Sequence, residues 1–222
     1  SDNPHASRKH FAGQSLQEII SELEQFCSMW RIGLNASKTK CLEFSKSKTN
    51  LTRPNLYLRN ELLKYEKCVK FLGITFDEKL TFETHINEIY EKCMKRLNLL
   101  KALTGRKWGA NSDTILYTYR TFIRPLIEYS SVLIAHCDQN MFRKIQSIET
   151  KAIKIAYDLP PWSLNTFCYD LVSFSPIGDR LKQLAKQFIE KNRNDFVLKH
   201  YIENAKPSLK GHHSPIYKAL NW

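Results

Sequence analysis

Carboxylates are the first residues to consider, because several of them together can hold catalytic metal ions. Asp77 lies in the stretch "KCVKFLGITFDEKLTFETHI", residues 67–86, and invites such a role. Two-metal phosphoryl transfer needs carboxylates that converge on both ions, and the 222-residue sequence contains no two adjacent aspartates. One isolated carboxylate cannot hold a metal pair. We therefore expect Asp77 to close a turn or to cap the helix that begins near Leu80, and we predict no catalytic residue in this chain.

Cysteine and histidine offer no firmer metal site. The six cysteines are scattered without a CxxC pair, at positions 27, 41, 68, 93, 137 and 168. This pattern fits neither a disulfide scaffold nor a zinc site, and favours reduced cysteines in the core of an intracellular protein. His200, His212 and His213 have no cysteine nearby at zinc spacing. The sequence therefore predicts no metal ligand.

Basic residues are the remaining candidates for function. The formal charge is +12, from 34 Lys and Arg against 22 Asp and Glu. This excess favours a polyanionic partner, with nucleic acid preferred over an anionic membrane, although some basic proteins bind no polyanion. Hydrophobic residues make up 42% of the chain, which is enough for a core. No apolar run approaches the ~18 residues of a membrane span, so we expect no membrane partner.

The elements that must position these residues fall into two groups. Residues 1–13 are polar and are expected to form a loop, after which a capping box at Ser15 and Glu18 predicts a helix that ends near Gly33. Its apolar face, expected to be buried, contains Leu16, Ile19, Ile20, Leu23, Phe26, Cys27 and Trp30. From residue 38 to residue 77 the hydrophobic period falls to two, which predicts a small antiparallel sheet.

Three parts of that sheet can be assigned. One strand is expected around Leu42 and Phe44, and a hairpin is expected to turn at Asn60-Glu61. A further strand contains Val69, Phe71 and Ile74, and its Gly73 suits a bulge or a close backbone approach.

After residue 80 the helical period predominates. The first predicted stripe contains Phe82, Ile86, Ile89, Cys93, Leu97 and Leu100, and the second Ile115, Tyr119, Phe122, Leu126, Ser130 and Leu133. Pro125 should kink or break the second helix. Asp138 should cap a third helix that ends at "DLPP", and a last helix over 179–192 should direct Leu181, Leu184, Phe188 and Ile189 inward. The sequence thus predicts an α+β fold, a small antiparallel sheet with a packing helix followed by an all-helical bundle.

This ordered set of elements resembles the reverse transcriptase of non-LTR retrotransposons, in particular the Jockey-like branch. The family has a Trp-ended helix, Asn-x-x-Lys-Thr before a strand, an aromatic-Leu-Gly-x-x-x-Asp segment, and Leu-x-aromatic-x-x-His-Ile. The residues that match are Trp30, Asn35, Lys38, Thr39, Phe44, Phe71, Leu72, Gly73, Asp77, Leu80, Phe82, His85 and Ile86. Later positions that resemble the family are Tyr119, Pro125, Tyr129 and Gln146. The resemblance spans roughly residues 16–192.

The resemblance implies three parts. Residues 1–80 would be the C-terminal part of the palm with the primer grip, 81–200 a helical thumb-like domain, and 201–222 a basic tail of unassigned structure. The intact enzyme is an RNA-directed DNA polymerase that uses Mg²⁺, and its catalytic aspartates would lie upstream, so this chain alone is expected to be inactive. Its implied partners are an RNA template, a DNA primer, and the upstream palm and fingers of the same polypeptide. Target-site copying implies the nucleus.

Individual residues acquire roles from the same resemblance. Phe71, Leu72 and Gly73 would form the primer grip, and Lys38 would donate a proton to pyrophosphate or contact a nucleotide; a solvated turn lysine is the alternative. Phosphate contacts in the thumb would come from Lys92, Lys95, Arg96, Lys101, Arg106 and Lys107, part of which is ordinary solvated surface. Trp108 could stack on a base or lie in the core. Tyr119 and Tyr129 are expected in the core.

Two other functions stay open. A host protein could have kept this fold as a nucleic-acid or protein interaction module after losing catalysis. A helical domain that binds nothing is the other. Codons for an aromatic-Ala-Asp-Asp turn immediately upstream of Ser1 would favour a polymerase fragment, and a Met start there would favour the module.

Overall fold

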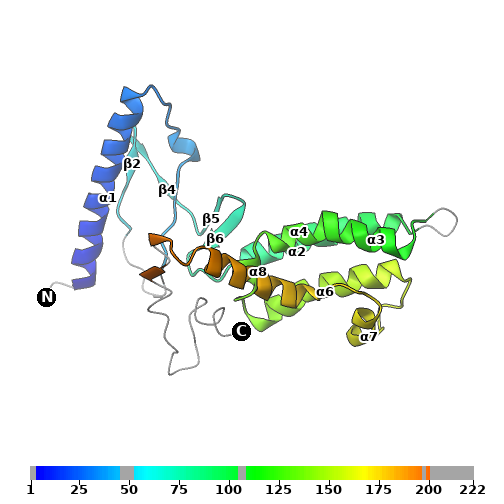
Figure 1. Ribbon diagram of the computed structural model, residues 1–222. Helices are drawn as coiled ribbons and strands as arrows, with labels where there is room; N and C mark the ends of the chain where they lie inside the picture. Colours follow the sequence, from blue (N-terminus) through cyan, green and yellow to red (C-terminus); the bar gives the residue numbers. More distant parts are fainter. Residues whose placement is uncertain (1–3, 46–52, 105–108, 197–198, 201–222) are drawn as a thin grey trace. The chain divides into compact units, whose positions relative to one another are not determined.

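The computed structural model describes residues 4–45, 53–104, 109–196 and 199–200 (Figure 1). The chain divides into two units, Ser1–Thr81 and Phe82–Trp222. The first combines one long helix with short strands, and the second is helical throughout its described part, so the expected α+β class is confirmed. No helix within the described ranges is long and apolar enough to cross a membrane.

The described part of the first unit contains three two-stranded sheets. Its elements are helix α1 (Pro4–Met29), 3-10 helix η1 (Ala36–Lys38), and strands β1 (Lys40–Cys41), β2 (Tyr57–Leu58), β3 (Glu61–Leu62), β4 (Lys64–Tyr65), β5 (Cys68–Phe71) and β6 (Ile74–Asp77). β2 pairs with β3 and β5 with β6 in antiparallel fashion, as expected, whereas β1 pairs with β4 in parallel. The strand expected around Leu42 and Phe44 ends before them, at Cys41.

Both antiparallel pairs are hairpins with two-residue turns. The first turns at Arg59-Asn60 rather than Asn60-Glu61, with φ angles of 51° and 61°. Positive φ at both central residues is typical of type I′ turns, which match the twist of the strands. The second hairpin turns at Leu72-Gly73, with φ of 46° and 82°. Gly73 therefore lies in a turn, and the expectation of a strand bulge was wrong.

Helix α1 starts earlier than the capping box suggested. It begins at Pro4, so Ser15 lies inside the helix and the expected loop over 4–13 is wrong. Proline is favoured at the first helical position, because its missing N–H has no partner there in any helix. The helix ends at Met29, after which Arg31 adopts φ of 55° and the Ile32 N–H donates to the Cys27 carbonyl at 2.8 Å. This is the hydrogen bond of a Schellman motif.

The apolar face of α1 is not buried as expected. Cys27 is buried and Ile20 half-buried, but Ile19 is 57% exposed and Trp30 65% exposed. A small core lies instead beside the helix, where the buried leucines 56, 58 and 63 meet Ile20, Leu34, Ala36, Cys41 and Tyr65. The side-chain amide of Gln17 fastens α1 to β2 by two hydrogen bonds, donating to the Tyr57 carbonyl at 3.0 Å and accepting from its N–H at 2.8 Å.

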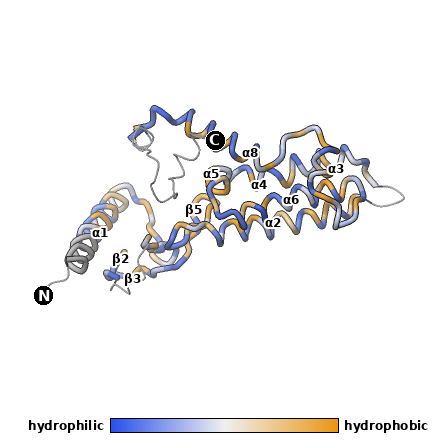
Figure 2. Tube along the Cα trace, turned by 90° about the horizontal axis from the view of Figure 1, so that it is seen from below, coloured by the Kyte–Doolittle hydropathy of each residue, from blue (hydrophilic) through white to orange (hydrophobic). Residues whose placement is uncertain are grey.

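The second unit is a bundle with one large buried cluster and a smaller one around Cys168. Its elements are α2 (Glu83–Ala102), α3 (Ser112–Thr118), π-helix η2 (Tyr119–Ile123), α4 (Arg124–Glu128), α5 (Ser131–Ile134), α6 (Gln139–Ala156), α7 (Asn165–Asp170) and α8 (Ile177–Lys191). Hydrophobic and hydrophilic residues alternate along α2 and α6, as expected for helices with one buried face (Figure 2). The predicted stripe of α2 is buried from Ile86 to Leu100.

Pro125 interrupts its helix as predicted. The helix that starts at Ser112 widens to a π turn over Tyr119–Ile123, Arg124 and Pro125 begin the next segment, and that segment ends at Glu128. Proline cannot donate a backbone hydrogen bond, and its ring clashes with the carbonyl one turn earlier. The wider π turn relieves that clash.

The later helices confirm most expectations. Asp138 caps α6 by accepting a hydrogen bond from the Asn140 N–H, and α6 ends at Ala156, before Pro160. α8 begins at Ile177 and buries Leu181 and Ile189. Phe188 is 47% exposed, so its inward placement was wrong. The short helix α7 had no clear period and was not predicted.

Candidate nucleic-acid interface

The tip of the β5–β6 hairpin exposes two large apolar side chains. Phe71 is 64% exposed and Leu72 74% exposed, and Gly73 beside them is also exposed. Phe71 pairs with Ile74 across the hairpin, so the three predicted grip residues lie together at one tight turn. Such a tip presents apolar side chains and backbone groups to the same neighbouring molecule, and recognition by backbone and shape requires no base sequence.

Asp77 anchors the base of this hairpin. Its carboxylate accepts hydrogen bonds from the N–H of Lys79 at 3.0 Å, the N–H of Thr81 at 3.1 Å, and the Thr81 hydroxyl at 3.2 Å. It therefore closes the turn after β6. Capping of α2 is not its role, because that helix begins after Phe82, without a side-chain cap. Among the described residues, no three His, Cys, Asp or Glu side chains are placed to hold a metal ion.

Lys38 lies at the end of a capped 3-10 turn. The side-chain oxygen of Asn35 accepts from the Lys38 N–H at 3.0 Å and from the Ser37 hydroxyl at 2.7 Å. The spacing Asn-x-x-Lys is thus the spacing of a capped turn, in which the asparagine holds the backbone and leaves the lysine exposed.

The predicted phosphate contacts on α2 differ from one another. Lys92, Lys95 and Lys101 are exposed. Arg96 is instead half-buried against its own bundle. Its guanidinium lies 4.2 Å from the Phe122 ring centroid and donates a hydrogen bond to the Phe122 carbonyl. Arg96 would therefore have to give up its contacts with Phe122 in order to bind a phosphate. The remaining three candidates, Arg106, Lys107 and Trp108, lie outside the described residues.

A buried polar cluster, not found from the sequence, holds the bundle together. Glu149 of α6 is fully buried and accepts from the Ile177 N–H at 2.6 Å and the Tyr119 hydroxyl at 3.2 Å. An Arg124 nitrogen lies 3.7 Å from the same carboxylate. Burial raises the pKa of Glu149 above its ordinary value, although these contacts lower it. Burial also raises the pKa of Tyr119 well above its ordinary value, with the Glu149 charge as the next cause.

Several residues of the family motifs have structural roles in the bundle. His85 is buried in the first turn of α2, where Nε2 lies 2.8 Å from the Ser130 hydroxyl at the break between α4 and α5. Tyr119 is in the core as expected, whereas Tyr129 is 65% exposed. Gln146 packs where α8 approaches α6, since a Cβ added at Gly178 would lie 2.7 Å from its Nε2. These residues position the helices.

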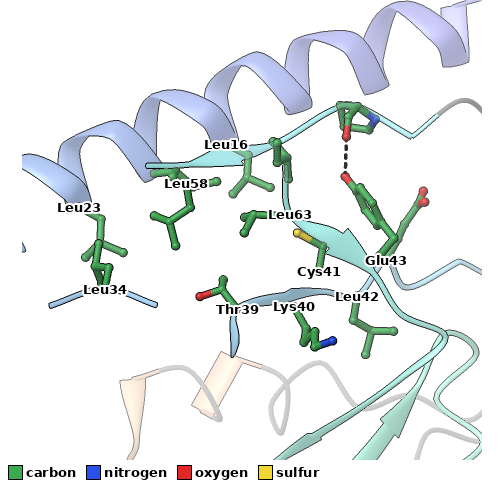
Figure 3. A pocket seen from close by; sticks show the side chains of 14 residues that line it. Leu16, Leu23, Leu34, Thr39, Lys40, Cys41, Leu42, Glu43, Leu58 and Leu63 are labelled. Carbon is green, nitrogen blue, oxygen red and sulfur yellow. Dashed lines mark hydrogen bonds between the residues drawn. The ribbon is translucent and has the colours of Figure 1, made fainter. Parts of the chain in front are cut away.

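An apolar groove runs beside α1 in the first unit (Figure 3). Figure 3 shows Leu16 and Leu23 of α1 facing Leu58, Leu63, Leu34 and Cys41 around one hollow. The volume of this groove is about 470 Å³. Its lining is mostly aliphatic, and it continues the exposed stripe of α1. A groove of this chemistry suits another apolar protein surface better than a nucleic acid.

The sequence of the chain is similar to RNA-directed DNA polymerases from mobile elements and transposons, so the resemblance inferred from the motifs is confirmed. It is 23% identical over 181 residues to the RNA-directed DNA polymerase from mobile element jockey of Drosophila melanogaster, a match that covers 81% of this chain and 19% of that protein. It is also 23% identical over 199 residues to the probable RNA-directed DNA polymerase from transposon BS of the same species, covering 88% of this chain and 22% of that protein.

A third relative is the probable RNA-directed DNA polymerase from transposon X-element, 20% identical over 189 residues, which covers 84% of this chain and 21% of that protein. The chain spans about a fifth of the length of the curated relatives it matches. No family model matches the chain, and no solved structure matches it.

Proposed function

We propose that this chain serves RNA-directed DNA synthesis as the primer-grip and thumb portion of a reverse transcriptase, gripping the duplex of RNA template and DNA primer. The observation that carries the proposal is the hairpin tip at Phe71–Gly73. Phe71 is 64% exposed and Leu72 is 74% exposed at a two-residue turn, so an aromatic and an aliphatic side chain are presented together to a neighbouring molecule. The similarity to RNA-directed DNA polymerases supports a nucleic-acid partner, and we assign this tip to the primer strand.

The chemistry itself is assigned to the rest of the polymerase. Within the described residues no cluster of three possible metal ligands occurs. Mg²⁺ and the catalytic carboxylates would belong to the upstream palm. That part of the polypeptide is also the proposed occupant of the apolar groove beside α1, and copying at a chromosomal site would take place in the nucleus.

Duplex binding tests the grip directly. A fluorescently labelled short RNA–DNA hybrid is titrated with the whole chain, and anisotropy gives the Kd at several salt concentrations. Replacing Phe71 and Leu72 together by serine should raise the Kd about tenfold, since a ring stacked on nucleic acid contributes ~1–3 kcal/mol. Because the lost contacts are apolar, the salt dependence of the Kd should stay the same.

Leu62→Ser is the matched control. Leu62 is 56% exposed on the other hairpin of the same unit, so the change removes a similar apolar area away from the grip. Its Kd should equal that of the wild type within about twofold. Equal losses in the control and in the Phe71/Leu72 variant would remove the hairpin tip from the interface.

A further inference from the structure

A cavity in the second unit gathers three arginines that no predicted role uses. Arg120 from η2, Arg124 from α4 and Arg180 from α8 line a hollow of about 520 Å³. We call it the arginine pocket; the other lining residues used in the argument are Glu128, Phe174 and Gln183. Residues 120 and 180 are far apart in sequence, so the fold, rather than a local charge run, brings these cations together.

The charges in the arginine pocket do not balance. Glu128 is the one carboxylate in its described lining, and it is shared: its Oε1 accepts from Arg124 Nε at 3.0 Å and lies 3.4 Å from Arg180 Nε. Three guanidinium groups and one carboxylate therefore line the hollow, and the buried Glu149 beside it, 3.7 Å from Arg124, is the second carboxylate within reach of them. Like charges held in one hollow repel each other, and a bound anion removes that repulsion.

Packing fixes Arg124 before any ligand arrives, and side-chain contacts orient the more exposed Arg120 and Arg180. Arg124 has a side chain only 7% exposed, and its Nη2 donates to the Ser175 carbonyl at 3.0 Å. The guanidinium groups of Arg120 and Arg124 lie 5.4 Å and 5.5 Å from the centroid of the same Phe174 ring. Arg180 donates to the Gln183 side chain at 3.1 Å. Donors ordered in this way lose little entropy on binding, which favours a tight anion site.

The backbone beneath the pocket is itself unusual. Arg120 lies within the π-helical turn Tyr119–Ile123, and Arg124 follows that turn immediately. Single π turns inside α-helices occur frequently at functional sites. Here the turn also contains Tyr119, whose hydroxyl donates to Glu149, and Glu149 faces Arg124. The buried cluster therefore positions one wall of the arginine pocket.

We propose that the arginine pocket binds a phosphate group, and that in the nucleic-acid complex this group is a backbone phosphate of the bound strand. Guanidinium groups present forked N–H donors that match phosphate oxygens, which makes arginine the preferred residue for such recognition. The nucleic-acid source rests on the proposed function. It names a phosphate contact separate from the hairpin tip and from the lysines of α2.

Inorganic phosphate tests the pocket without nucleic acid. The Nε–H resonances of Arg120 and Arg180 are followed by NMR while phosphate is added to the whole chain. A saturable shift of both resonances is expected in the wild type, and the shift of the remaining arginine should be lost in Arg120→Gln and in Arg180→Gln. Resonances that do not move, or that move without saturating, overturn the proposal.

Hybrid binding then tests the source of the phosphate. Arg120→Gln and Arg180→Gln should each raise the Kd for a short RNA–DNA hybrid about tenfold. Each should also reduce the slope of log Kd against log salt by about 1, the value for one lost phosphate contact. Lys186→Gln is the matched control, because it removes one charge from an exposed position on α8 that does not line the pocket. The proposal fails if the arginine variants bind the hybrid as this control does.

The two assays separate the pocket from the proposed function. If the wild-type chain does not bind the hybrid while phosphate still shifts both arginines, the proposed duplex grip fails, and the phosphate ligand is a small molecule rather than a strand. If the wild type binds the hybrid and the hairpin-tip variant weakens it, but phosphate shifts neither arginine, the grip stands and the arginine pocket is overturned.

Discussion

The two units of the chain are stabilised in different ways. In the second, buried side chains from α2, α6, α8 and the segments between them form one large cluster, with a buried ion pair beside it. In the first, the largest described cluster has three buried leucines, and α1 leaves most of its apolar stripe exposed. Two-stranded sheets are marginal by themselves. The bundle therefore has a substantial core of its own, whereas the strand unit has a small core and depends more on turn hydrogen bonds.

Matched isoleucines give the largest expected contrast. Ile148 of α6 is fully buried, and Ile148→Ala should lower the free energy of unfolding by about 3 kcal/mol, because it removes apolar contacts and leaves a cavity. Ile19 of α1 is 57% exposed, so Ile19→Ala should change it by less than about 0.5 kcal/mol. Urea unfolding followed by circular dichroism measures both. Similar losses for the two variants would mean that the stripe of α1 is buried in solution, by a second copy or by another part of the chain.

Turn hydrogen bonds should contribute a larger share of the stability in the strand unit than in the bundle, because the strand unit has the smaller core. Asp77→Ala removes the acceptor for two backbone N–H groups and one hydroxyl, and should lower the free energy of unfolding of the first unit by about 1–2 kcal/mol. Glu61→Ala, on an exposed strand of the same unit, should be neutral within about 0.5 kcal/mol. Protease susceptibility of the segment after β6 provides the readout. An Asp77 variant as resistant as the control would show that the turn stays closed without its carboxylate.

The same division explains how far the sequence could predict the fold. Helices of the bundle were located from periodicity, because each buries one face against a shared core; Ile86 and Leu100 are examples. The same periodic pattern in α1 led to a wrong prediction of burial. A periodic stripe shows that a helix is amphipathic, but it does not show that another element covers the apolar face. The helix start predicted at Ser15 was also wrong, because a capping-box sequence can occur inside a helix that begins earlier.

The candidate site was only partly accessible from sequence for a similar reason. Phe71–Gly73 form one contiguous motif, so they could be grouped as one candidate from the sequence, although the turn that exposes them was not predicted. The arginine pocket brings together Arg120 of η2 and Arg180 of α8. Residues so far apart in the sequence form no periodic pattern from which their proximity could be predicted. Glu149 likewise reads as an ordinary helix-surface glutamate until Arg124 and the Ile177 N–H are placed beside it.

Backbone strain at the hairpin tip should give a smaller effect than the lost turn hydrogen bonds. Gly73 has φ of 82°, a conformation that side chains with a Cβ rarely adopt, so Gly73→Ala should lower the free energy of unfolding by about 1 kcal/mol. Gly33 is the control, because a Cβ added there meets nothing within 4 Å and its φ is not in the left-handed region. Gly33→Ala should be neutral. If both variants were equally stable, the β5–β6 turn would be relaxing at little cost, and the tip would be less rigid than a grip requires.

The last prediction concerns pH and the buried Glu149 of the bundle. Burial raises the pKa of Glu149, so the folded chain holds this proton more tightly than the unfolded chain does. The contribution of Glu149 to stability is therefore greatest below its ordinary pKa of 4.5 and is lost as the pH rises from there through the folded pKa. Glu149→Gln removes this titration. The free energy of unfolding of the wild type, minus that of the variant, should fall as the pH is raised over that range. A difference that rises instead would mean that Arg124, Tyr119 and the Ile177 N–H outweigh burial and hold Glu149 ionised.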